Sequence, residues 1–232
     1  MKIFRLPKKI TALIFDMDLT LYSHAEYGQI QIDNLIAIAA EKRGLSLAET
    51  NREIEAARLS WAASHNGNRP SLSNIILSWG FTMEENVSWR ERAYEPEKFL
   101  KRDEKLKACL LALSYSLGIV TNNPLSIAKR TLACLGIEDC FDALACLDTL
   151  MIAKPHRLPF EKVVELLNNC SLNDSSMNAS PEIQHTPESC VSIGDRYEID
   201  LELPLEMGMG AILVDGVEDV YTLPEVLRRN YE

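Results

Sequence analysis

Five short apolar segments constrain the fold of this chain more than any other feature. They are Thr11–Phe15, Ser116–Val120, Asp142–Cys146, Cys190–Ile193 and Gly210–Val214. They lack the alternation of polar and apolar residues that marks a strand with one solvated face, so we expect strands covered on both faces. Segments with helical character separate the later strands, at Leu125–Leu135, Pro159–Asn168 and Leu201–Met207. This order predicts an α/β fold with a doubly wound parallel sheet.

The first strand is not followed by an ordinary crossover. Residues 16–115 separate it from the second strand, and they carry helical patterns at Ile30–Arg43, Leu47–His65 and Leu72–Phe81. All three tryptophans, at positions 61, 79 and 89, lie in this insert. A long segment with its own aromatic residues predicts a helical subdomain at residues 21–98, inserted into a core of residues 1–20 and 99–232.

The charge of the chain limits its partners. The formal net charge is -10, whereas a protein that binds a nucleic acid polymer normally carries a basic face. No apolar run approaches the roughly 18 residues of a membrane-spanning helix, and Pro7-Lys8-Lys9 interrupts any signal peptide. We therefore expect a soluble, cytoplasmic protein that binds neither a nucleic acid polymer nor a membrane.

The cysteines and one polar segment carry weaker signals. The six cysteines form no CxxC pair and no zinc-like spacing with histidine. Four of them lie in or beside apolar segments, and we expect buried thiols at Cys109, Cys134, Cys140 and Cys146. The segment Leu172–Ser189 is rich in Ser, Asn and Pro, which predicts an extended surface loop.

Polar side chains follow three of the predicted strands. Asp16-Met17-Asp18-Leu19-Thr20 follows the first strand, Thr121-Asn122-Asn123 the second, and Gly194-Asp195, with Asp200 close behind, the fourth. Ligands of open parallel sheets bind beyond the carboxyl ends of the strands, so these groups should lie together. Clustered carboxylates stay ionised at neutral pH beside a cation, and oxygen ligands suit Mg²⁺. With Lys154 in the loop beyond the third strand, the set predicts a site for a phosphate dianion.

These segments resemble the four motifs of the haloacid dehalogenase superfamily, in the same order. Phe15–Leu21 resembles the first motif, DxDxT, and Ile119–Asn122 resembles the second, a strand that ends in Thr or Ser. Lys154-Pro155 is similar to the third motif, and Gly194–Asp200 to the fourth, GDxxxxD. The helical insert also lies where some members carry a helical cap. The resemblance spans nearly the whole chain and implies a Rossmann-like core with a cap.

The resemblance implies the catalytic roles. Asp16 would attack phosphorus and form an aspartyl-phosphate, which divides one displacement into two. Asp18 would protonate the leaving oxygen and then activate the hydrolytic water. Lys154 would stabilise the nucleophile and the charge that develops on the phosphoryl group.

The resemblance also implies the binding roles. Thr121 and the backbone N–H of Asn122 would hold phosphoryl oxygens. Asp18 would contribute its backbone carbonyl to the metal, and Asp200 would act in a supporting or water-mediated position. The implied Mg²⁺ ligands are Asp16, Asp18, Asp195 and Asp200.

These roles imply a Mg²⁺-dependent phosphatase that hydrolyses a small phosphate monoester. FDxDxTLY followed by a helical cap is most similar to the pyrimidine 5′-nucleotidase branch, which makes a nucleoside monophosphate the leading expectation for the substrate. A phosphomutase would share all four motifs. A dehalogenase would share the nucleophile but has no use for an acid at Asp18. A non-enzymatic phosphate-binding module would require a broken catalytic set.

Two positions depart from the common pattern, and one face of the insert has two interpretations. Leu19 stands where many relatives have Gly, Asn or Asp, and Arg196 where a small polar residue is common; we expect effects on loop shape and substrate choice.

Arg58, Trp61 and His65 share a helical face and could contact a leaving group. Because apolar stripes in helices are usually core, we expect Trp61 in the core of the cap, with Arg58 and His65 solvated beside it.

Overall fold

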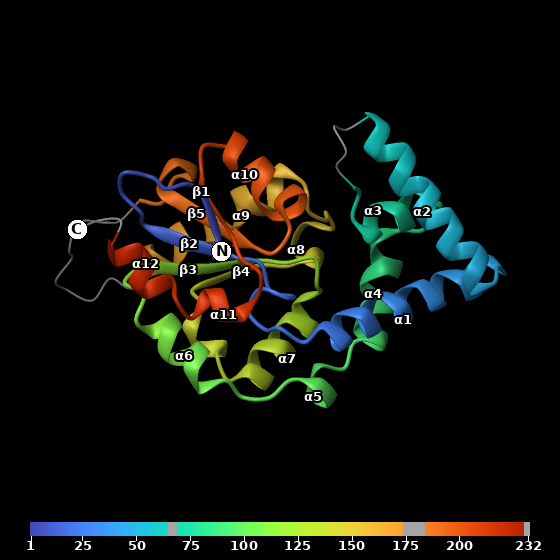
Figure 1. The fold of residues 1–232 in the computed structure, drawn as a ribbon, viewed down its shortest axis with the longest axis horizontal. Helices are drawn as coiled ribbons and strands as arrows, with labels where there is room; N and C mark the ends of the chain where they lie inside the picture. Colours follow the sequence, from blue (N-terminus) through green and yellow to red (C-terminus); the bar gives the residue numbers. More distant parts are fainter. Residues whose placement is uncertain (65–68, 174–183, 230–232) are drawn as a thin grey trace.

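The sheet of the computed structural model, which describes residues 1–64, 69–173 and 184–229, has the order β1-β6-β5-β2-β3-β4 (Figure 1). Its strands are β1 (Lys2–Arg5), β2 (Ala12–Phe15), β3 (Ser116–Val120), β4 (Ala143–Ala145), β5 (Cys190–Gly194) and β6 (Gly210–Leu213). Neighbours among β2 to β6 run parallel, and β1 pairs antiparallel with β6 at the edge. The predicted α/β fold is confirmed, with each of the five predicted strands present within one or two residues.

Helices cover both faces of the sheet. On one face lie α6 (Glu104–Leu111), α7 (Leu125–Leu135), α11 (Val217–Val220) and α12 (Leu223–Arg229). On the other lie α9 (Arg157–Asn173) and α10 (Glu202–Glu206). Leu13 and Phe15 of β2 pack into the first layer, and Ala12 and Ile14 into the second. Both sets of side chains are therefore buried, which explains why β2 is an uninterrupted apolar run.

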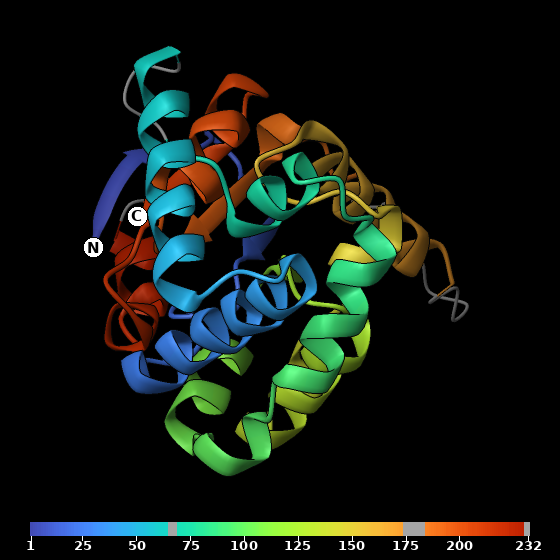
Figure 2. The same ribbon diagram turned by 90° about the vertical axis from the view of Figure 1, so that its right-hand side faces the viewer.

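The helices between β2 and α6 precede those that cover the sheet, and Figures 1 and 2 show α1 to α4 beside the sheet rather than over a face. They are α1 (Ala25–Arg43), α2 (Leu47–Ser64), α3 (Leu72–Ser78), α4 (Met83–Ala93) and α5 (Pro96–Phe99). Leu35, Ile76 and Trp89 belong to a separate apolar cluster within this group. The helix α5 spans the predicted boundary at 98–99, and the division into a core and a cap stays a prediction.

Local signals set the limits of these helices. Gly44 ends α1 in the left-handed conformation, with φ of 66°. The predicted helix 72–81 ends instead at Ser78, because Gly80 has φ of 91°. Thr82 and Glu85 then form a reciprocal capping box that begins α4.

Short elements connect the layers. They are η1 (Glu138–Cys140), α8 (Leu147–Leu150), η2 (Pro187–Ser189) and the π-helix η3 (Tyr197–Leu201). Residues 174–183 of the predicted surface loop lie outside the described residues. Its start belongs to α9, and near its end His185 is 2% exposed and lies 3.0 Å, Nδ1 to Oγ1, from Thr11. The prediction of an extended surface loop is therefore wrong at the start of the segment and at the buried His185.

Two further expectations concern cysteines and membranes. All six cysteines are free, and those at positions 109, 140, 146 and 190 are buried, whereas Cys134 is half-buried and Cys170 is exposed. Within the described ranges, every helix is too short or too polar to cross a bilayer.

Candidate active site

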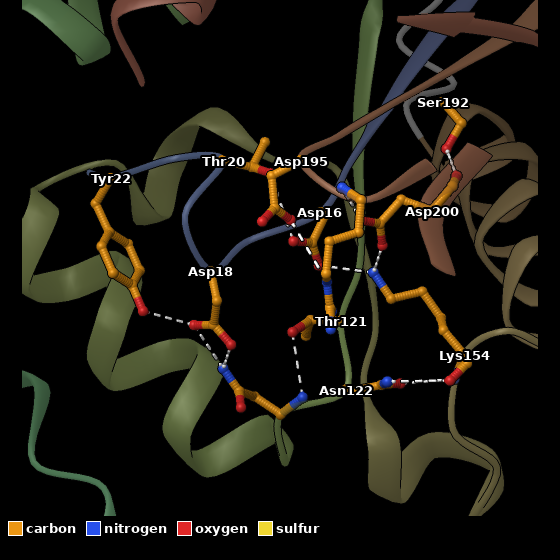
Figure 3. A network of polar contacts seen from close by, with 12 residues as sticks. Asp16, Asp18, Thr20, Tyr22, Thr121, Asn122, Lys154, Ser192, Asp195 and Asp200 are labelled. Atoms are coloured by element: carbon orange, nitrogen blue, oxygen red, sulfur yellow. Dashed lines mark hydrogen bonds and ion pairs between the residues drawn. The ribbon is translucent and has the colours of Figure 1, made fainter. Parts of the chain in front are cut away.

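The residues predicted for the site converge beyond the carboxyl ends of the parallel strands (Figure 3). Asp16 directly follows β2, and its backbone N–H donates to the carbonyl of Ile193 in β5 at 2.8 Å. Thr121 follows β3, and Asp195 follows β5. The polar groups meet because parallel strands end at the same edge.

A buried lysine links two carboxylates at the centre of the site. Lys154 Nζ lies 2.6 Å from Asp16 Oδ1 and 2.6 Å from Asp200 Oδ1, and all three side chains are almost wholly buried. Burial would lower the pKa of Lys154, but the attraction of the two carboxylates outweighs burial and raises it. The lysine therefore stays charged.

The pKa of Asp16 reflects the same crowding. Burial raises it to about 7; Lys154 opposes this shift, and the charges of Asp200 and Asp195 add to it. Burial likewise raises the pKa of Asp195 to about 6. Without a further cation, Asp16 and Asp195 therefore retain protons more strongly than free aspartates do.

The arrangement fits Mg²⁺. One carboxylate oxygen each from Asp16, Asp195 and Asp200 lie within 4.8 Å of one another. Asp195 Oδ1 is buried without a hydrogen-bond partner among the described residues, and the nearest cation is Arg196 Nε at 3.7 Å. A compact set of hard oxygen donors that includes one unsatisfied oxygen is suited to a small divalent cation.

Asp18 lies outside this group of three carboxylates. Its Oδ1 accepts a hydrogen bond from the Tyr22 hydroxyl at 2.7 Å, and Asn123 Nδ2 donates to both of its oxygens, at 3.0 and 2.8 Å. Figure 3 shows the Asp18 carboxylate turned toward Tyr22. Burial and then the Asp18 charge raise the pKa of Tyr22, so the phenol keeps the proton that it donates.

The second motif supports the loop that carries the lysine. The Asn122 side chain accepts from the backbone N–H of Lys154 at 2.6 Å and donates to its carbonyl at 3.2 Å. Thr121 Oγ1 accepts from the backbone N–H of Asn123 at 3.1 Å. The predicted phosphate contacts of Thr121 and Asn122 stay predictions, whereas the structure gives the Asn122 side chain a role in holding Lys154.

Asp200 owes its position to the backbone of β5. A Cβ atom on Gly194 would lie 2.4 Å from Asp200 Cβ. Ser192 Oγ donates to the Asp200 carbonyl at 2.8 Å, and the Arg196 N–H donates to Asp200 Oδ2 at 3.1 Å. This close approach requires glycine at position 194.

We expect Gly194→Ala to displace Asp200 and separate it from Lys154. Overpacking of a tight site costs about 1–3 kcal/mol in the free energy of unfolding. Turnover should fall at least about tenfold, since a 1 Å misplacement can cost more than that. Denaturant unfolding and steady-state kinetics test both effects. Gly28→Ala is the control, because its Cβ would make an ordinary 3.5 Å contact with Leu19; a Gly194→Ala variant that matches it would contradict the expectation.

A sequence model of the haloacid dehalogenase-like hydrolases matches residues 10–208, a range that includes all four motifs. The chain belongs to this family. The match therefore confirms the resemblance inferred from the motifs.

Solved structures share the fold of this hydrolase at low identity. A haloacid dehalogenase-type phosphatase from Thermococcus onnurineus is 21% identical with a TM-score of 0.58, covering 94% of this chain and 98% of that one. A magnesium-bound hydrolase of this type from Bacillus subtilis is 15% identical with a TM-score of 0.53, covering 94% and 99%. A 2-haloacid dehalogenase from Pseudomonas syringae is 22% identical with a TM-score of 0.52, covering 95% and 99%.

The structure shows the surroundings of Leu19 and Arg196, the two positions that depart from the pattern of the haloacid dehalogenase family. Leu19 adopts φ of 59°, in the left-handed region that leucine rarely occupies and that glycine or asparagine accepts readily. The Arg196 side chain is 50% exposed beside Asp195. Arg196 therefore borders the carboxylate group rather than facing away from it.

The expected position of Trp61 in a cap core is wrong. Its side chain is 43% exposed and lines a cavity of about 320 Å³, together with Asn74, Pro155 and Glu198. Pro155 directly follows Lys154 in the chain, and the described residues that line the cavity include none of the predicted site residues themselves. Arg58 is part-exposed and pairs with Glu55 at 2.6 Å, and His65 lies outside the described residues.

Sequence reasoning did not assign roles to Tyr22, Asn123 or Gly194. Tyr22 lies four residues after Asp18, and Asn123 extends the second motif by one position. Both positions are polar neighbours of motif residues, which was the available signal. The role of Gly194 depends on a close backbone approach to Asp200, and the glycine of the GDxxxxD motif was the available signal for it.

Proposed function

We propose that this hydrolase is a Mg²⁺-dependent phosphatase that cleaves a small phosphate monoester through an aspartyl-phosphate on Asp16. Asp16, Asp195 and Asp200, with the Asp18 backbone carbonyl, would hold Mg²⁺. The bound ion would neutralise charge on the phosphoryl oxygens.

One observation carries the proposal: two aspartates two positions apart have different surroundings. Asp16 contacts the Lys154 cation at 2.6 Å within the carboxylate group. Asp18 instead accepts hydrogen bonds from the neutral donors Tyr22 and Asn123. Carboxylates in separate environments can take separate roles, one as nucleophile and one as acid and base.

The proposed reaction has two displacements. An Asp16 oxygen forms a bond to phosphorus as the bond to the leaving oxygen breaks, and Asp18 gives that oxygen a proton. Asp18, now a carboxylate, takes a proton from water as the water oxygen attacks the aspartyl-phosphate. The Asp16–phosphorus bond breaks, which releases phosphate and restores both aspartates. Lys154 stabilises the added negative charge in each step.

The cavity beside Pro155 is the proposed place of the leaving group. Trp61 is partly exposed and lines this cavity with Arg69 and three glutamates, and an aromatic side chain can stack against a base or another flat group. A nucleoside monophosphate is therefore the leading substrate that we propose among phosphate monoesters.

The test is a panel of phosphate monoesters, with nucleoside monophosphates and an aryl phosphate, scored by phosphate release with Mg²⁺. We expect release that stops in excess chelator and returns with added Mg²⁺. Full activity in chelator would contradict the metal assignment.

Measurements on the same protein samples also distinguish the alternative activities. Halide release from 2-haloacids would favour a dehalogenase. A phosphate that moves within a sugar phosphate without release would favour a phosphomutase. Binding of phosphate without turnover on any substrate would favour a non-enzymatic module.

A further inference from the structure

The Asp18 carboxylate is held from two separate parts of the chain. Tyr22 donates to it from the segment that leads from β2 into α1, and Asn123 donates to it from the loop after β3. Both donors are neutral and buried. They direct Asp18 away from the ion pairs that join Lys154 to Asp16 and Asp200.

Asn123 is poorly explained as a contributor to stability. The residue is fully buried, yet its Oδ1 has no hydrogen-bond partner among the described residues. A buried carbonyl without a partner is costly, whereas its amide nitrogen makes two contacts with Asp18. The Asn123 side chain therefore costs folding free energy at its carbonyl oxygen, while its amide nitrogen donates to the carboxylate of Asp18. This combination indicates a functional role.

Tyr22 is fixed by packing as well as by its hydroxyl. Its ring lies 6.0 Å from that of Tyr27, which stacks on Phe99 at 4.9 Å with an interplanar angle of 16°. The phenol oxygen thus has a defined location, and removal of the hydroxyl should leave the ring packing intact.

Asp18 needs such support, because it lies two residues from Asp16 beside a strongly charged group. A carboxylate free to rotate would be drawn toward the Lys154 cation or a bound divalent ion. Its oxygens would then leave the position from which they could exchange a proton with the leaving group. Proton transfer requires that position to within hydrogen-bond reach.

We propose that Tyr22 and Asn123 are positioning residues that hold the Asp18 carboxylate apart from the Asp16–Lys154–Asp200 ion pairs, in the orientation for acid and base catalysis. This inference rests on the proposed phosphatase function. It adds two side chains that touch the acid/base rather than the phosphoryl group.

The experiment compares Tyr22→Phe and Asn123→Ala with wild type on an aryl phosphate and a nucleoside monophosphate. Each variant should lose about tenfold in kcat, a part of the 10²–10⁴-fold that a proton-transfer group supplies. KM should stay within about twofold, because in this proposal both residues act through Asp18. Tyr27→Phe is the control for removal of a neighbouring buried tyrosine hydroxyl; its kcat should be unchanged.

A double-mutant cycle separates positioning from a structural role. In an Asp18→Asn background, Tyr22→Phe and Asn123→Ala should cause little further loss, because they act through Asp18. Unchanged kcat in both single variants, a change confined to KM, or an equal loss in the Asp18→Asn background would overturn the inference. An active wild type with unaffected variants would overturn this inference alone. A wild type that releases no phosphate from any substrate would overturn the proposed function and this inference with it.

Discussion

An Asp16→Asn variant should keep its fold and lose turnover nearly to background, a loss on the order of 10⁴-fold or more as for other removed nucleophiles. Asp16 is buried at the end of β2, and its Oδ1 contacts Lys154 at 2.6 Å. Asparagine keeps the shape of the side chain but removes the charge of the attacking oxygen. Steady-state phosphate release measures the loss, and mass spectrometry verifies that the amide has not deamidated.

Covalent chemistry gives the same expectation a second measurement. A phosphate mimic such as beryllium fluoride should bind wild type together with Mg²⁺ and fail to bind the Asp16→Asn variant. Asp139→Asn serves as the control, because Asp139 is exposed, pairs with Lys107 and has no role in the proposed reaction. Near-normal turnover by Asp16→Asn would mean that water attacks phosphorus directly, and it would exclude an aspartyl-phosphate.

The sequence predicted the parallel part of the sheet because each of those strands is covered on both faces. Such strands must be apolar throughout, as β2 is, with Leu13 and Ile14 packing into opposite layers. The edge strand β1 has the sequence KIFR, and all four of its residues are exposed. It therefore lacks the apolar run that identified the others; it pairs with the backbone of β6, and Arg5 Nε also donates to the Met209 carbonyl at 2.9 Å.

The site likewise contains residues that the sequence could place and residues that it could not. Groups carried at the ends of strands, such as Asp16 and Asp195, could be placed together because topology fixes where strands end. Contacts that depend on loop conformation could not be placed. Asn123 reaches Asp18 across 105 positions of the chain, and Trp61 lines a cavity against residues far along the sequence. A stripe on a helix shows which residues share a face, not whether another element covers that face.

Replacement of Lys154 by methionine should cause the largest loss of stability of any substitution considered. Methionine retains the length of the aliphatic chain but leaves Asp16 and Asp200 buried without their cation, and removal of one partner from a buried ion pair costs about 3–5 kcal/mol. Denaturant unfolding in chelator near neutral pH measures this cost. Lys162→Met is the control: Lys162 forms a more exposed pair with Glu165, for which about 0–1 kcal/mol is expected.

The pH dependence shows whether charge is the cause. The pKa of Asp16 is already raised to about 7 in the folded protein, and loss of Lys154, which opposes this shift, should raise it further. A carboxyl whose pKa is higher in the folded than in the unfolded state makes stability fall as pH rises between the two values. The cost of Lys154→Met should therefore be smaller at about pH 5, where Asp16 can hold a proton in both proteins, and should grow only as pH rises above about 7, toward about pH 8. An equal cost at both pH values would instead assign the loss to packing of the lysine side chain.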